Sequence, residues 1–184
     1  MRTFTKNSIL IFAGMLFFVS CSKEFNTVLP LEYDQKFPEE SARNIEIVSS
    51  ENARPNFILF APVLNKYTGE NSYTDCPEGV KVTSFDENGS IQSVLTSDYA
   101  ISFDDTELME ARKNVVIVDL KKNETIETEK IVWDKQHKRI FSDVEIRQTK
   151  ADGTVNIGDG FDADEKFTKY SIRNPRGEVI EEGL

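Results

Sequence analysis

The chain has 184 residues, of which 32 are acidic, 22 are basic and one is histidine, and its formal net charge is −10. This acidic balance excludes nucleic acid as an expected partner, because binding to phosphates requires a basic surface. A single histidine also argues against a catalytic triad or a histidine-based metal site.

The first twenty residues have the pattern of a secretory signal peptide. Arg2 and Lys6 precede an apolar stretch at 9–19, which is far shorter than the ~20 residues a helix needs to cross a bilayer. A small residue and then Cys21 end this stretch as FVSC, which resembles the bacterial lipobox. We therefore expect a signal peptide at 1–20 and a lipid attached to Cys21. The alternatives are an ordinary signal peptide with a chance cysteine, or an uncleaved N-terminal anchor.

Cleavage before Cys21 would leave 164 residues (184 minus 20), enough for one domain with a core. Two basic residues and no acidic one would be lost, so the net charge would become −12 (−10 minus 2). With lipid on Cys21, the other cysteine, Cys76, has no partner. We expect no disulfide and predict that Cys76 is a small buried residue.

After the cysteine, residues 21–37 form the expected lipidated N-terminus and tether, and residues 38–44 could form one helical turn. From Ile45 onward, β-branched runs such as VVIV at 115–118 alternate with turn sequences. The turn sequences are DENGS at 86–90, KKNE at 121–124 and KADGT at 150–154. Regularly interrupted short strands predict an all-β domain.

An internal repeat supports this prediction. Similar segments begin 36, 31 and 31 residues apart, at Leu59, Leu95, Ile126 and Ile157. In the first three, a second strand carries a valine 21, 20 and 18 residues later, at Val80, Val115 and Val144. Each unit is therefore about one β-hairpin, and stacked hairpins must share a core because one hairpin cannot bury its apolar face.

The window DTELMEARK at 105–113 conflicts with the all-β prediction, since it consists largely of helix formers. The repeat places it where its counterpart, RIFS at 139–142, has strand character. We therefore predict strand for both.

The order and spacing of these segments resemble the LptC family, the periplasmic component of lipopolysaccharide export. The resemblance is carried by PEESARNIEIVSSENARPNFILFAPVLNKY, CPEGVKVTSFDENGSIQSVLTSDYA, LMEARKNVVIV, ETEKIVWDKQHKRIFSDVEI and GDGFDAD. It implies an open, V-shaped β-jellyroll of stacked antiparallel hairpins over residues 38–175, as in LptC and the related LptA and OstA proteins. Residues 176–184 would be a C-terminal tail.

The resemblance implies a carrier, without enzymatic activity or cofactor. Such a carrier accepts lipopolysaccharide from an inner-membrane ABC transporter and passes it to a periplasmic bridge protein by edge-strand pairing. The lipid A acyl chains would lie against an apolar inner face. We expect that face to include Leu59, Leu95, Ile126, Trp133, Ile157 and Phe161.

A G-x-x-F element of the family corresponds to Gly158 and Phe161. Because the repeat ends there, the last strand is expected to be uncovered, and Gly158 would let the backbone of the bridge protein approach closely. In the alternative interpretation, Gly158 relieves a bulge or a close strand approach and Phe161 belongs to the core.

Other polar segments offer weaker candidates. The only histidine, His137, lies in a basic cluster that we interpret as a solvated turn rather than as a phosphate contact. The acidic segment at 156–165 lacks the spacing of an EF-hand, so no metal site is expected. No pair of acidic residues stands out as catalytic.

Many LptC proteins have a transmembrane helix where this chain has a lipobox. The family favours the inner membrane for the anchored periplasmic protein, while the residues after Cys21 leave the outer membrane open. The alternative function is a structural or adaptor lipoprotein that uses the hairpins for protein contacts only. A carrier should have an apolar cleft open to solvent, whereas an adaptor should have a closed core.

Overall fold

The computed structural model describes residues 37–51, 53–165, 167 and 169–178. They fall within one compact unit of the chain, residues 36–184. Their regular structure is entirely β-strand, and no described helix is long and apolar enough to span a membrane. The predicted all-β class is therefore confirmed. The expected signal peptide, the lipid on Cys21 and nearly all of the tether lie outside the described residues.

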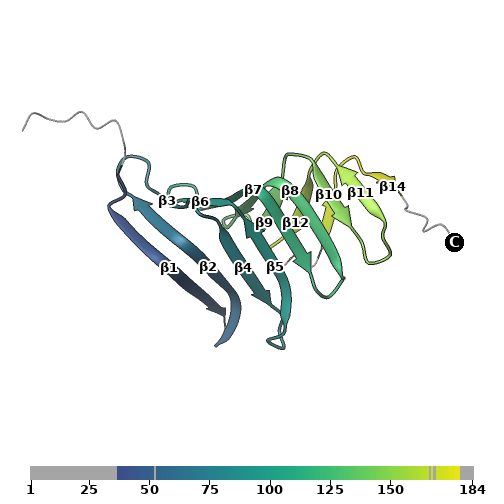
Figure 1. Cartoon of the computed structure of the whole chain (residues 1–184), viewed down its shortest axis with the longest axis horizontal. Helices are drawn as coiled ribbons and strands as arrows, with labels where there is room; N and C mark the ends of the chain where they lie inside the picture. Colours follow the sequence, from purple (N-terminus) through teal and green to yellow (C-terminus); the bar gives the residue numbers. More distant parts are fainter. Residues whose placement is uncertain (1–36, 52, 166, 168, 179–184) are drawn as a thin grey trace, which may run out of the picture. The chain divides into compact units, whose positions relative to one another are not determined.

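The described strands form one antiparallel sheet (Figure 1). They are β1 (Glu40–Glu51), β2 (Arg54–Tyr67), β3 (Tyr73–Cys76), β4 (Val80–Phe85), β5 (Ile91–Ser97), β6 (Tyr99–Phe103), β7 (Leu108–Asp119), β8 (Glu124–Asp134), β9 (Arg139–Ser142), β10 (Ile146–Thr149), β11 (Val155–Gly158), β12 (Phe161–Asp164), β13 (Tyr170–Ile172) and β14 (Arg176–Glu178).

The long strands β2, β7 and β8 each change partners along their length, which divides the sheet into two branches. On β7, residues 108–112 pair with β6, whereas residues 116–119 pair with β5. On β8, residues 125–128 pair with β10 and residues 132–134 with β9. One branch thus ends in β10, β11 and β14, and the other in β9, β12 and β13. The space between the branches is the interior of the sheet.

Most of the segment rich in helix formers, residues 108–113, is strand as the repeat predicted, whereas residues 105–107 form a turn. The strand part begins β7, where β6 pairs with it on one side and β8 on the other. Two ladders of backbone hydrogen bonds and the inward-facing apolar side chains outweigh helix propensity here. A bulge at Lys113 and Asn114, both with positive φ, separates this half of β7 from the rest.

Two local predictions were wrong. The segment at 38–44 is not a helical turn, because β1 begins at Glu40 and pairs with β2. Val144 does not lie in a second strand, and the segment around it at 142–146 is not one strand, because the chain leaves β9 at Ser142 and enters β10 at Ile146. These two strands belong to different branches, so the chain must cross between them.

The last strand of the repeat is not uncovered, contrary to our expectation. The strand β11 pairs with β10 on one side and with β14 on the other. The short β14 lies at 176–178, in the segment that we expected to be a tail. Three residues are too few to show a strand pattern in the sequence.

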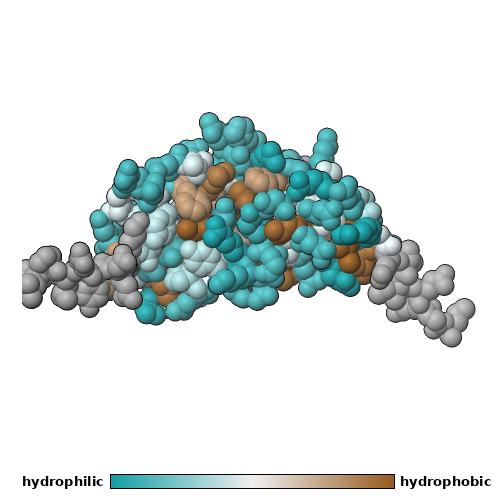
Figure 2. Space-filling view, turned by 90° about the horizontal axis from the view of Figure 1, so that it is seen from above, coloured by the Kyte–Doolittle hydropathy of each residue, from teal (hydrophilic) through white to brown (hydrophobic). Residues whose placement is uncertain are grey.

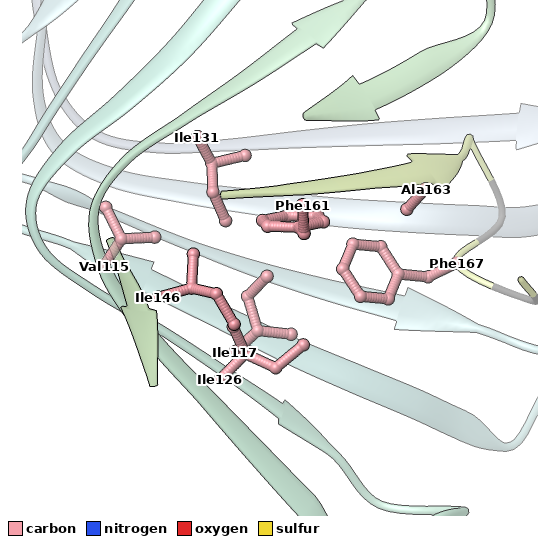
Figure 3. Close-up of a cluster of buried hydrophobic side chains, with 8 residues drawn as sticks. All are labelled: Val115, Ile117, Ile126, Ile131, Ile146, Phe161, Ala163 and Phe167. Atoms are coloured by element: carbon pink, nitrogen blue, oxygen red, sulfur yellow. The ribbon is translucent and has the colours of Figure 1, made fainter. Parts of the chain in front are cut away.

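Two clusters of buried side chains stabilise the sheet. The larger one joins β7, β8, β10 and β12 and includes Phe161, which is fully buried (Figure 3). The smaller one contains Ala61, Cys76 and Val80, on β2 to β4. The strongest packing therefore lies toward the C-terminal strands.

Candidate functional site

A cavity of about 1070 Å³ lies inside the described sheet. Ligand pockets typically measure about 300–1,000 Å³, so this space is large enough for a sizeable apolar group. Most of the side chains in its interior are apolar. They include Phe57, Leu59, Leu64, Val80, Val82, Leu95, Ile101, Met109, Ile117, Ile131, Trp133 and Ile140.

The alternation of side chains along each strand produces this lining. On β4, Val80 and Val82 contact the cavity, whereas Lys81 between them does not. On β5, Leu95 contacts the cavity and its exposed neighbour Thr96 does not. Successive side chains of a strand point to opposite faces of the sheet, so the sequence places apolar groups inside and polar groups outside.

The structure separates the six residues predicted for the groove. Leu59, Leu95 and Trp133 line the cavity. Ile126 and Phe161 lie instead in the larger buried cluster, with 2% and 0% of their surfaces exposed. Ile157 is on β11 and is not among the lining residues. Contact with lipid stays a prediction for all six, and the geometry favours the first three.

An aromatic contact spans the two branches at the cavity. The ring of Phe57 on β2 meets the ring of Trp133 on β8 edge to face, with 5.8 Å between the ring centroids. The Nζ atom of Lys135 lies 5.2 Å from the centroid of the Trp133 ring. The indole Nε1 atom is buried and has no hydrogen-bond partner among the described residues.

Charged side chains surround one end of the cavity and are largely paired with one another. Lys121 Nζ lies 2.8 Å from Asp86 Oδ2, and Arg54 donates to the carbonyl oxygen of Glu87. The hydrogen bond from Lys121, helped by the backbone N–H of Ser90, lowers the pKa of Asp86. An apolar interior with a charged rim suits an amphipathic ligand.

The C-terminal end of the interior is closed by packing and by a buried polar network. The Tyr170 hydroxyl donates to both carboxylate oxygens of Glu124, each at 2.9 Å, and Gln148 Nε2 donates to Glu124 Oε2. Glu124 and Gln148 are only 7% and 2% exposed. Burial first, and then the hydrogen bond to the Glu124 carboxylate, raises the pKa of Tyr170.

Gly158 lies at a close approach within the sheet. A Cβ atom there would overlap Ile172 Cγ2 and lie 2.7 Å from the carbonyl oxygen of Arg173. The glycine is thus required for packing, as in the alternative interpretation of the G-x-x-F element. A contact of Gly158 with a partner protein stays a prediction.

The remaining candidates are consistent with structural roles. His137 is exposed in a turn, where its Nδ1 lies 2.8 Å from Asp134 Oδ2. Cys76 is buried, and burial together with the nearby charge of Asp75 raises the pKa of its thiol to about 11. No group of potential metal ligands occurs among the described residues.

The first strand offers a long edge that the sequence analysis missed. In the described sheet, β1 pairs with β2 and with no other strand. Ile47 and Val48 on it are 43% and 55% exposed. The surface in view in Figure 2 is mostly hydrophilic, with apolar patches between the polar groups. The run IEIV within PEESARNIEIV was the signal, because alternating aliphatic residues predict a strand.

Residues 8–171 match the family described as lipopolysaccharide-assembly, LptC-related. The chain belongs to the LptC-related family. A comparison with curated proteins finds no significant match.

Membership confirms the family resemblance seen in the sequence. The LptC-related family acts in lipopolysaccharide transport, in the periplasm and cell envelope, and it is a transport component rather than an enzyme. Lipopolysaccharide and the other components of the export machinery are therefore the partners that the family implies. The open antiparallel sheet is consistent with a jellyroll of the LptC type.

Proposed function

We propose that this protein is a lipid-anchored carrier that accepts lipopolysaccharide from an inner-membrane ABC transporter and passes it to a periplasmic bridge protein. The observation that carries the proposal is the large cavity lined by apolar side chains inside an open sheet. An adaptor that made only protein contacts would not need such a space. Family membership supplies the identity of the cargo class.

Burial of the acyl chains provides the binding energy in this proposal. Each methylene transferred from water to an apolar site contributes ~0.8 kcal/mol, so a chain of a dozen carbons gains roughly 10 kcal/mol before ordering costs are subtracted. Binding then needs no nucleotide. The energy for directional movement comes from the transporter.

Edge strands connect the carrier to its neighbours in this proposal. Among the described strands β1 pairs only with β2, and its other edge suits addition of a strand from a partner. At the other end of the described sheet, the short end strands β13 and β14 would pair with the bridge protein. We had expected this role of the strand that contains Gly158. A chain of such proteins would join apolar interiors end to end.

Photo-crosslinking in cells tests the carrier function. A photoreactive amino acid at Leu95, inside the cavity, should capture lipopolysaccharide, whereas the same group at the adjacent, exposed Thr96 should not. Equal labelling at the two positions would contradict a lipid-binding interior. Labelling of proteins alone, at both positions, would favour the adaptor function.

The anchor has its own test. Substitution of Cys21→Ala should block processing or release the protein from membranes. Mass spectrometry of the native protein should find a lipid-modified Cys21 as the first residue. A native protein that retains residues 1–20 would contradict the lipobox interpretation.

A further inference from the structure

The two branches of the sheet touch each other across the cavity through a pair of aromatic rings. Phe57 on β2 meets Trp133 on β8 edge to face, with 5.8 Å between the ring centroids. Both side chains belong to the cavity lining. The strands β2 and β8 are not paired with each other in the described sheet. The rings therefore join two walls of the cavity by side-chain contact alone.

The pair lies at the mouth between the branches. On β2, residues 57–60 pair with β4 and residues 65–67 pair with β3, so the branches separate between these ranges and the start of β2 is an outer end. On β8 the outer end is the last part of the strand, because residues 132–134 pair with β9. Phe57 is the fourth residue of β2, and Trp133 is the last but one of β8. Two rings near the outer ends of their branches span the mouth.

The closed arrangement leaves one polar group of the pair unsatisfied. The Nε1 atom of Trp133 is buried and has no hydrogen-bond partner among the described residues. A buried donor without an acceptor costs free energy and is rare in native proteins. A movement that takes the indole out of this contact would let its N–H group reach water. Separation of the rings thus recovers part of the free energy that is lost with the contact.

An amphipathic ligand would have to pass this contact. A lipid whose acyl chains lie in the cavity keeps its charged headgroup in water, because burial of a charge is costly. The link between the two parts of the lipid then crosses the mouth. Since the rings close the mouth where they meet, the link cannot move along the sheet, from β1 and β2 past β4 to β5, until the rings separate.

We infer that Phe57 and Trp133 form an aromatic gate, which closes the mouth of the cavity and parts to let a lipid with a large polar headgroup pass toward Leu95 on β5. One aromatic contact is weak compared with the burial of an acyl chain, so lipid binding can drive the opening. This inference rests on the proposed function, since it requires that acyl chains enter the cavity.

A reversible bridge across the gate tests this inference. The full chain with Phe57→Cys, Trp133→Cys and a photoreactive amino acid at Leu95 is placed in phosphatidylcholine nanodiscs and incubated with lipopolysaccharide. A short bifunctional methanethiosulfonate joins the two new cysteines. Propyl methanethiosulfonate caps them instead, with similar bulk and no bridge. Burial raises the pKa of the Cys76 thiol to about 11, so this native cysteine should react little with either reagent.

The joined protein should capture about tenfold less lipopolysaccharide at Leu95 than the capped protein, because the state that lets lipid pass is removed. A reductant that cleaves the bridge should restore the capture. Equal capture by the joined and the capped protein would overturn the gate and leave the carrier function intact. If the wild-type gate with the same photoreactive group captures no lipopolysaccharide, the carrier function fails and the gate fails with it.

Two single substitutions test the gate without a chemical bridge. Phe57→Ala removes one ring, so lipopolysaccharide should reach Leu95 about two- to tenfold faster than in the wild type, the factor for the loss of one aromatic contact. Leu59→Ala removes an apolar side chain from the same strand and the same cavity wall but neither ring of the gate, and it should not speed the capture. Equal rates in the two variants would contradict a gate at Phe57 and Trp133.

Discussion

The sheet contains two regions that use the same alternation of side chains with different results. We call strands β1 to β6 the open half and strands β9 to β13 the closed half; β7 and β8 join them. In the closed half, Phe161 and Ile146 are at most 1% exposed. In the open half, Leu59, Val82 and Leu95 are only partly buried and line a cavity.

The difference lies in what fills the space between the two branches. In the closed half, Phe161 on β12 and Phe167 just after that strand lie among aliphatic residues of β7, β8 and β10 (Figure 3). The two rings lie 5.7 Å apart. In the open half, the aromatic rings of Phe57 and Phe85 border the cavity and do not fill it, and no described residue there is inserted between the branches as Phe161 is. Large aromatic groups from one added strand thus turn a groove into a core.

Removing the buried ring of Phe161 should have the largest effect on stability. Phe161→Ala should lower the free energy of unfolding by about 3–5 kcal/mol, because it removes a fully buried ring and leaves a cavity. The matched change in the open half, Phe57→Ala, should cost about 1–2 kcal/mol, since that ring is only partly buried and already borders a cavity. Urea unfolding measures both. Equal losses would mean that the halves do not differ in packing.

Gly158 tests the close approach of strands in the closed half. Gly158→Ala should destabilise the protein by about 2 kcal/mol, because its Cβ would overlap Ile172. Gly177→Ala on β14 is the control and should cost less than about 1 kcal/mol, since the nearest atom to its Cβ would be a side-chain oxygen of Asn156, at 3.2 Å. A thermal melt distinguishes the two. A normal melt for Gly158→Ala would contradict the described packing of β11.

The polar network of the closed half should contribute less, and its contribution should depend on pH. Tyr170→Phe should cost about 1–2 kcal/mol at neutral pH, because Glu124 stays buried and loses a donor. The pKa of Tyr170 is raised in the folded protein, so its contribution is complete below about pH 10, the pKa of an unfolded tyrosine, and falls above it. The variant should therefore lose less stability than the wild type between about pH 9 and pH 11. If the free energies of unfolding of the variant and the wild type change with pH in the same way, Tyr170 does not contribute to the network.

The smallest effect should come from β1, which pairs only with β2 among the described strands. Val48→Thr should change the free energy of unfolding by less than about 0.5 kcal/mol, because Val48 is 55% exposed. The backbone amides of β1 should also exchange hydrogen faster than those of β8, which is paired on both sides. A loss above about 1 kcal/mol would show that this edge is covered in the isolated protein.

The repeat and the turn sequences were sufficient to predict the class of the fold. They overruled local propensity at 108–113 correctly, because pairing on both sides of a strand outweighs the preference of single residues for helix. The same reasoning failed at 142–146, where the chain crosses between branches. A crossing depends on long-range pairing, which the spacing of residues along the chain does not encode.

The candidate site was predictable in part. Equivalent repeat positions placed Leu59 and Leu95 on the cavity but also selected Ile126, which is in the core. A repeat position determines the face of the sheet on which a side chain lies. It does not determine whether another strand covers that face. Only the three-dimensional structure shows that β12 packs over Ile126. The same is true of the buried indole N–H of Trp133, which has no partner among the described residues.

Mass spectrometry of lipids bound to the protein tests the central claim most directly. The protein purified from its own membranes should carry lipopolysaccharide. Met109→Glu, which puts a charge in the cavity, should carry severalfold less, while Thr96→Glu on the outer face of β5 should carry as much as the wild type. Lipopolysaccharide that is absent from all three proteins, or equally abundant in them, would contradict a lipid-binding open half.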